Sequence, residues 1–152
     1  SVHCKSIKHP NLPKLSDSRS SIILDYGSDL RCCLSLNHTH DNKSHGMKHS
    51  HAYARVEGLT GAAYIKFGLL LNYPKGEAEE IEISTDGVEW TKVNNVGPWF
   101  PDAFIGTMSS LQRFATGEDD QLSHSVENAY KTMAVVYACL DSSYSPGTTV
   151  KY

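Results

Sequence analysis

The sequence lacks any long apolar run. Its apolar stretches, such as Gly68–Leu71 and Ala134–Tyr137, are much shorter than the roughly 20 residues of a membrane-spanning helix. No apolar run follows the lysines Lys5, Lys8 and Lys14, so the opening segment does not have the pattern of a secretory signal. These absences predict a protein without membrane contact, located in the cytoplasm.

Cysteine and positive charge are also scarce. The four cysteines include no CxxC pair and no regular spacing, which indicates reduced, mostly structural thiols. The formal net charge of −3 leaves no concentrated basic face, so nucleic acid is not expected as a partner. Acidic residues cluster between Glu77 and Glu89, a pattern more typical of a solvated strand face than of a metal site.

The composition is that of a globular protein with one core. The chain has 152 residues, of which 39% are hydrophobic and 20% are charged, within the usual range of a single soluble domain. Residues 1–19 contain Pro10 and Pro13 among many polar residues. We predict that this segment is an extended lead-in or linker remnant, and that residues 20–152 form the folded domain.

Apolar residues then alternate with a period of two, which is the pattern of β-strands. Leu30–Leu36 is the clearest case, because its leucines fall on one face together with Cys32. Asp86-Gly87 is a hairpin dipeptide, and the short turns favour antiparallel neighbours. The strands expected are 20–24, 30–36, 52–57, 62–71, 79–84 and 88–93.

The period changes to that of helices after residue 97. Pro101 suits a first helical position, and an apolar stripe follows as far as Gly117. Ser125 is a good N-cap for a second helix, which Pro146-Gly147 ends. A short strand is expected at Thr148–Lys151. Strands followed by helices predict an α+β fold, an open and predominantly antiparallel sheet with two helices packed on one face.

Several segments between about residues 20 and 150 resemble the carboxy-terminal domain of the Gfo/Idh/MocA family of oxidoreductases. The segment that opens the penultimate helix of that domain is similar to Gly97–Met108, and its final helix is similar to Ser123–Ala138. Two turns of its sheet are similar to Asp25-Tyr26-Gly27 and Val56–Ala62, and its end is similar to Ser143–Val150.

The resemblance implies a two-domain enzyme. In the family, an amino-terminal Rossmann domain binds NAD or NADP, and the α+β domain contacts a sugar, a polyol or a derivative of one. The sheets of that domain commonly pair to form dimers. Neither the glycine-rich loop G-x-G-x-x-G nor the family's catalytic Glu-Lys-Pro lysine has a match here.

We therefore expect the chain to be the substrate-binding and dimerisation domain of an NAD(P)-dependent oxidoreductase, without a catalytic residue or bound cofactor of its own. It is expected to be a fragment of a longer protein or one half of a split gene, with its Rossmann domain in cis or in trans. The alternative is a free-standing ligand-binding or scaffolding module without redox activity.

Histidine is concentrated in one loop, which contains five of the eight histidines, between His38 and His51. Spacings such as His38-x-His40 are also found in metal sites, but Asp41 is the only nearby carboxylate, and no metal is predicted. Substrate contact is the favoured interpretation, since amide and imidazole groups both donate and accept hydrogen bonds and so suit hydroxyl-rich ligands. Asn37, His38 and His40 are the candidates.

Two further residues complete the candidate substrate site. Trp99 could stack on a sugar ring, or it could be a core aromatic that joins the first helix to the sheet. Arg31 could bind an anionic substrate, or it could be a solvated arginine. The sheet face that no helix covers is expected to pair with a second copy of the chain, because a large exposed face is commonly buried in a two-fold dimer.

Overall fold

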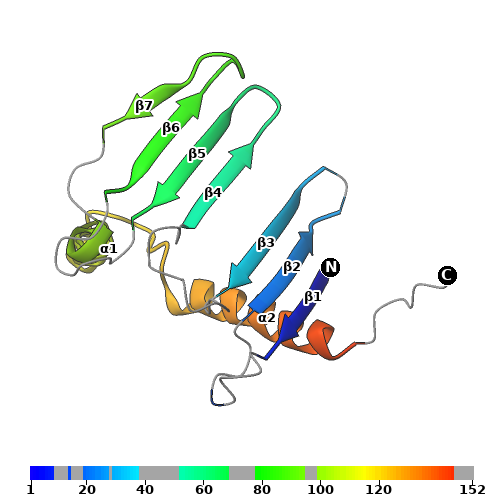
Figure 1. The fold of residues 1–152 in the computed structure, drawn as a ribbon. Helices are drawn as coiled ribbons and strands as arrows, with labels where there is room; N and C mark the ends of the chain where they lie inside the picture. Colours follow the sequence, from blue (N-terminus) through cyan, green and yellow to red (C-terminus); the bar gives the residue numbers. More distant parts are fainter. Residues whose placement is uncertain are drawn as a thin grey trace. The chain divides into compact units, whose positions relative to one another are not determined.

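The computed structural model of the chain describes residues 1–8, 14, 19–27, 29–37, 52–68, 78–94 and 99–145. The chain divides into two compact units, and each is described by itself. The first unit combines Ser1–Lys43 with Ser123–Tyr152, and the second is Ser44–Leu122. Figure 1 shows the strands and helices of both units.

The first unit contains a three-stranded antiparallel sheet in the order β1-β2-β3. Its strands are β1 (Val2–Ile7), β2 (Arg19–Asp25) and β3 (Arg31–Asn37). The ends of β2 and β3 therefore lie within one residue of the ends of the strands predicted at 20–24 and 30–36. The pairing of Ile22 with Leu34 confirms the predicted alternation, because it places the leucines of β3 on one face with the apolar residues of β2.

The turn between β2 and β3 explains the Asp25-Tyr26-Gly27 motif. Gly27 has a φ of 109°, in the region that favours glycine because other residues clash there. The Asp25 side chain accepts a hydrogen bond from the Gly27 N–H at 2.9 Å, and the Tyr26 N–H donates to the Leu30 carbonyl at 3.2 Å. These contacts fix the hairpin at a motif that the sequence resemblance had marked as a sheet turn.

The first residues of the chain are not an extended lead-in. Val2–Ile7 forms β1, which pairs along its whole length with β2. The prediction failed here because the inward positions of β1 include Cys4 and Ser6, so that its alternation is too weak to recognise without its partner strand. The cross-strand pairing with β2 stabilises the strand in place of strong intrinsic propensity.

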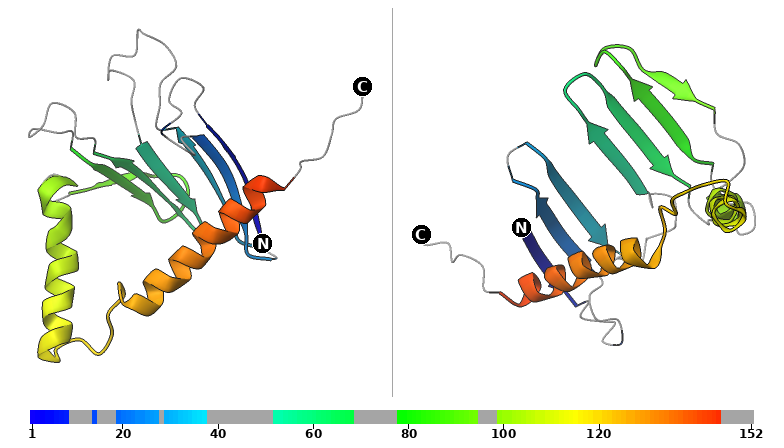
Figure 2. Two further views of the ribbon diagram at one scale, coloured as in Figure 1. Left: turned by 90° about the horizontal axis from the view of Figure 1, so that it is seen from below. Right: turned by 180° about the vertical axis from the view of Figure 1, so that it is seen from behind.

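The helix α2 (Val126–Tyr144) packs against the edge strand β1. Both views in Figure 2 show α2 beside β1. Ser125 caps the helix as predicted, since its hydroxyl accepts a hydrogen bond from the Asn128 N–H at 3.4 Å. The backbone N–H of Glu127 is the largest cause that lowers the pKa of the Glu127 carboxyl, and the Ser125 hydroxyl lowers it further. The helix therefore begins at the residue that the sequence indicated.

The second unit contains a four-stranded antiparallel sheet in the order β4-β5-β6-β7. Its strands are β4 (Ala52–Glu57), β5 (Ala62–Phe67), β6 (Glu80–Ser84) and β7 (Thr91–Val93). β5 ends at Phe67, and residues 69–71 of the predicted strand 62–71 lie outside the described residues. β7 begins at Thr91 instead of at residue 88, and β4 has the bounds expected. Successive strands pair in the order of the sequence, as the short turns predicted.

The turn between β6 and β7 is organised by one carboxylate. Asp86 Oδ1 accepts hydrogen bonds from the N–H groups of Val88 and Glu89, at 2.8 and 3.0 Å, and from the Ser84 hydroxyl at 3.1 Å. Gly87 has a φ of 75°, as the predicted hairpin dipeptide requires. The backbone N–H donors are the largest cause that lowers the pKa of Asp86, and the Ser84 hydroxyl lowers it further.

This carboxylate predicts a pH dependence. The pKa of Asp86 is lower in the folded chain than the value of about 3.9 expected in the unfolded chain. Its contribution to stability is therefore present above that unfolded value and is lost as the pH falls through the folded pKa. Asp86→Asn keeps an acceptor oxygen but cannot titrate. Its melting temperature should fall below that of the wild type at pH 7, and the two should converge in acid. A difference that stays constant with pH would contradict this role.

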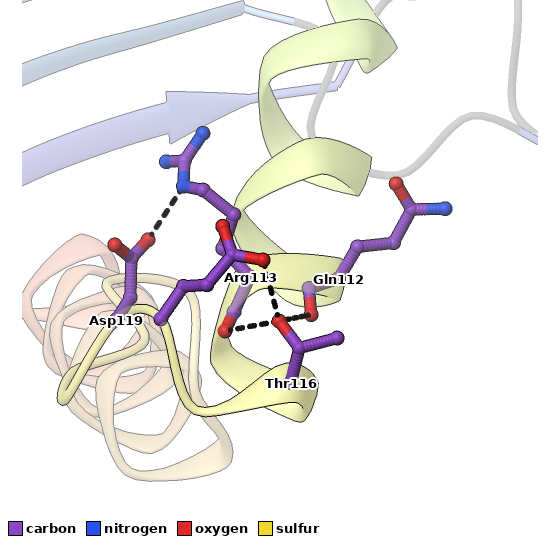
Figure 3. Close-up of polar contacts among 5 residues, drawn as sticks. Gln112, Arg113, Thr116 and Asp119 are labelled. Carbon is purple, nitrogen blue, oxygen red and sulfur yellow. Dashed lines mark hydrogen bonds and ion pairs between the residues drawn. The ribbon is translucent and has the colours of Figure 1, made fainter.

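The helix α1 (Trp99–Thr116) ends where the sequence predicted. Gly117 has a φ of 78°, the left-handed conformation common after the last helical residue. Figure 3 shows the polar contacts at this end. The Thr116 hydroxyl lies 3.1 Å from the carbonyl oxygens of Gln112 and Arg113, and Arg113 Nε donates to Asp119 Oδ2 at 2.9 Å.

The α+β class with open antiparallel sheets is confirmed. Its strands form two sheets rather than the single sheet expected, since the described residues include no ladder between β3 and β4. The segment between Asn37 and Ala52 is too long for the short-turn argument to apply, and it lies outside the described residues, as does the strand predicted at 148–151. No helix in the described ranges combines the length and the apolar character needed to cross a bilayer.

Candidate functional site

The predicted substrate residues fall on the open face of the first sheet or outside the described residues. Arg31 and Asn37 are the first and last residues of β3, and both point to the face opposite Leu34. His38 and His40 lie outside the described residues, together with the histidine loop. Trp99 begins α1, but its side chain lies outside the described part of the chain. Only Arg31 and Asn37 can therefore be placed.

Arg31 and Asn37 are far from each other. Six residues of a strand span roughly 20 Å, more than a single monosaccharide can reach. Asn37 pairs across the sheet with Arg19, while Arg31 pairs with Asp25 at the opposite end of the same two strands. Arg31 and Asn37 thus lie at opposite ends of the sheet. Asn37 and Arg19 define one, which also leads directly into His38 and His40.

Positive charge predominates on this open face, which we call the β1–β3 polar face. Its residues are His3, Lys5, Ile7, Arg19, Ser21, Ile23, Asp25, Arg31, Cys33, Ser35 and Asn37. Arg19 and Arg31 outnumber the single carboxylate of Asp25, whose pKa is lowered mainly by the Gly27 N–H, while Lys5 Nζ donates to the Ser143 carbonyl of α2. The excess positive charge and the row of hydroxyl and amide groups suit a ligand with hydroxyl groups and a negative charge.

One face of the second sheet is different in character, and we call it the β4–β7 mixed face. Aromatic, cationic and acidic side chains alternate there with small ones. The cross-strand register places these residues together: Tyr53, Arg55, Glu57, Ala62, Tyr64, Lys66, Glu80, Glu82, Ser84 and Lys92. Trp90 precedes β7 and joins this face through its contact with the Arg55 guanidinium. Sequence analysis interpreted the acids of this stretch as a solvated strand face, and Glu80 and Glu82 do lie on one face of β6.

The aromatic residues of the mixed face are arranged in two pairs. The rings of Tyr53 and Tyr64 stack with centroids 6.0 Å apart and planes 29° from parallel. The guanidinium of Arg55 lies 5.6 Å from the centre of the Trp90 ring, within the range of a cation–π contact. Tyr53 is 59% exposed and Trp90 is 38% exposed. These rings therefore present a large amphipathic area to solvent while they are held in place by neighbours.

The charges of the mixed face balance each other. Glu80 Oε1 lies 3.5 Å from Lys66 Nζ, and Glu80 Oε2 lies 3.5 Å from Lys92 Nζ. Arg55 Nε donates to Glu57 Oε1 at 2.6 Å. Exposed ion pairs of this kind add little stability. Their effect is to fix the pattern of charge, in which three cations, Arg55, Lys66 and Lys92, alternate with the three carboxylates of Glu57, Glu80 and Glu82.

Sequence analysis missed this mixed face as a candidate site. The signal was present, because Tyr53, Arg55 and Glu57 alternate with small and apolar residues along one strand, and Tyr64 and Lys66 do so along the next. The register between the strands was needed to show that these residues share one face. Across the described residues, no group of three or more histidine, cysteine, aspartate or glutamate side chains could hold a metal ion.

The comparisons with known proteins give no relative for this chain. No protein-family model matches it, and no curated protein and no solved structure matches it. The two sheet faces and the sequence resemblance are therefore the observations that bear on the function of the chain.

Proposed function

We propose that the chain is the substrate-binding and dimerisation domain of an NAD(P)-dependent oxidoreductase that acts on a sugar, a polyol or a derivative, and that it works in the cytoplasm. The observation that carries this proposal is the pair of open sheet faces, one rich in hydroxyl, amide and cationic groups and the other rich in aromatic groups with balanced charge. The motifs that carry the resemblance fall at the β2–β3 turn, at the β4–β5 turn and at the start of α2, which supports the same proposal.

The proposed substrate site lies at the end of the β1–β3 polar face that Asn37 and Arg19 define. Histidine and asparagine side chains can donate to and accept from sugar hydroxyls, and the arginine adds a preference for an acidic sugar derivative. His38 and His40 remain part of the proposal as the residues that follow Asn37 in the sequence. Arg31 is left out of this site by its distance along β3.

The proposed dimer uses the β4–β7 mixed face. A two-fold axis brings the same patch of both copies together, so a patch with three cations and three carboxylates can be complementary to itself. Tyrosine, tryptophan and arginine, the residue types that most often dominate interface energies, lie together on this face. A stable dimer of this kind buries on the order of 1,600 Å² in total.

The dinucleotide is proposed to bind to another domain of the enzyme. The Rossmann site is built from parallel strands joined by helices, whereas every strand pair among the described residues is antiparallel. The described residues do not fit this cofactor. NADH added to the isolated chain should show no fluorescence change that indicates binding tighter than about 100 μM.

The substrate proposal predicts measurable binding by the isolated chain. Ligand-observed NMR with neutral hexoses, polyols and sugar acids, each present at about 10 mM, should detect at least one ligand, since this concentration populates complexes with dissociation constants near 1 mM. Asn37→Ala should weaken binding of that ligand at least about tenfold, the effect of losing roughly one good hydrogen bond.

Arg31→Ala is the matched control, since Arg31 lies on the same face of the same strand at its other end. This variant should bind the ligand as the wild type does. The proposal fails if no ligand of the panel binds, or if Arg31→Ala weakens binding as much as Asn37→Ala.

In the NADH titration, tight binding would place the cofactor on this chain and would overturn the domain assignment.

A further inference from the structure

Two of the four cysteines lie together at the contact between β1 and α2. Cys4 is on the face of β1 that contains Val2 and Ser6, and Cys139 is on the half-buried side of α2. The Cys4 N–H donates a hydrogen bond to the Ser142 hydroxyl at 2.8 Å. Because residues three apart in a helix share a face, this bond places the Cys139 side of α2 directly over Cys4.

The electrostatic surroundings of Cys139 agree with this placement. Burial raises the pKa of the Cys139 thiol, and the Cys4 thiol raises it further. On its other side, Cys4 Sγ lies 3.7 Å from the Ser6 hydroxyl. A second bond, from Lys5 Nζ to the Ser143 carbonyl at 3.2 Å, holds the end of α2 against the same strand.

The other two cysteines are not placed to form a disulfide with Cys4. Cys32 lies on the inward face of β3, but β2 stands between β3 and β1, and Cys4 pairs with Ile22 while Cys32 pairs with Leu24. Two strand spacings alone separate their Cα atoms by about 9.5 Å, beyond the roughly 7 Å that a disulfide can span. Cys33 points to the opposite face of β3. Adjacent strand residues also point apart, which disfavours a Cys32–Cys33 bond.

We propose that Cys4 and Cys139 are a reactive thiol pair, which a small-molecule disulfide such as glutathione disulfide converts to an intramolecular disulfide. The Cys4 thiolate attacks one sulfur of glutathione disulfide, forms a mixed disulfide and releases one glutathione thiolate. Cys139 then loses its proton to solvent, attacks the Cys4 sulfur as a thiolate and releases the second. The raised pKa of Cys139 slows this step, but the step is intramolecular because the two residues lie at the same β1–α2 contact. Two protein thiols are oxidised and two glutathione thiols are formed, so that electrons and protons balance.

The bond ties the first strand of the chain to its last described helix. It closes a loop that contains most of the chain, and a cross-link across such a long loop restricts the unfolded state most. Oxidation therefore stabilises the β1–α2 contact, and reduction releases it. This inference is independent of the proposed substrate and dimer sites, because Cys4 and Cys139 are on neither the β1–β3 polar face nor the β4–β7 mixed face.

The test is a disulfide map of the full chain after equilibration with glutathione disulfide. Trypsin cleaves after Lys5, Arg31 and Lys131, so Cys4, the Cys32-Cys33 pair and Cys139 fall on separate peptides. Unreacted thiols are alkylated before digestion without reductant. We expect one cross-linked species that joins the Cys4 and Cys139 peptides, with Cys32 and Cys33 alkylated. We also expect half of the four thiols to be lost and a mass decrease of about 2 Da, the two hydrogens removed.

Cys4→Ser and Cys139→Ser should each abolish the cross-link, while Cys33→Ser, the control on the opposite face, should retain it. Circular dichroism of each variant shows whether it is folded. The wild-type map decides the question even if a variant does not fold. A wild-type map with no Cys4–Cys139 species, with a Cys32–Cys33 bond instead, or with only mixed disulfides to glutathione would overturn the proposal.

Discussion

Gly61→Ala is expected to destabilise the second sheet by about 3 kcal/mol, the upper part of the usual range for an overpacked site. A Cβ atom at Gly61 would lie 2.3 Å from the Ser84 carbonyl oxygen and 3.1 Å from the Thr85 Cα. Both atoms belong to the backbone of the paired segment and cannot rotate away. Ser84 itself is only 4% exposed. The glycine is therefore required by the close approach of β5 to the end of β6.

Gly58→Ala is the matched control in the same turn. The Gly58 N–H donates to the Gly61 carbonyl at 2.8 Å, a bond that alanine keeps. A Cβ at Gly58 meets no atom closer than 3.6 Å, so the change should stay within about 0.5 kcal/mol. Urea unfolding measures the stability of both variants, and a shift of the midpoint without a change in the m-value reports a change in the free energy of unfolding. Equal midpoints for the two variants would show that the close approach of Gly61 to Ser84 does not require a glycine at position 61.

Tyr53→Ala is expected to weaken the proposed dimer by at least about 30-fold, because truncating a central aromatic of an interface commonly costs 2 kcal/mol or more. Tyr53 is 59% exposed in the chain and stacks on Tyr64. Its ring is thus pre-oriented on the β4–β7 mixed face, with little conformational freedom left to lose on association. Sedimentation equilibrium of the variant over a range of concentrations gives the change in dissociation constant.

Tyr130→Ala is the control for this substitution. Tyr130 lies on α2 and is 76% exposed, so the change removes a similar exposed ring from outside the mixed face. The variant should associate as the wild type does. If Tyr130→Ala weakens the dimer and Tyr53→Ala does not, the interface lies elsewhere on the chain.

Local chemistry made much of the secondary structure predictable from the sequence. Gly27, Gly87 and Gly117 all have positive φ values, and each was placed in a turn or at a helix end from its neighbours alone. Ser125 was recognisable as a cap because a hydroxyl before an apolar helical stripe can satisfy a free N–H. These features depend on a few adjacent residues, and sequence carries that information directly.

Features that depend on pairing between distant residues were not predictable in the same way. β1 is stabilised by its register with β2 and by α2, which lies more than 100 positions later in the sequence. The β4–β7 mixed face became visible only when the register joined Arg55 to Tyr64 and Tyr64 to Glu82.

The mass of the wild-type chain in solution tests the central claim most directly. We propose that the β4–β7 mixed face joins two copies of an oxidoreductase substrate domain. Sedimentation equilibrium at tens of micromolar should therefore give a species with about twice the 16.8 kDa chain mass, as expected for an interface of standard size. A single species at 16.8 kDa under the same conditions would contradict the account.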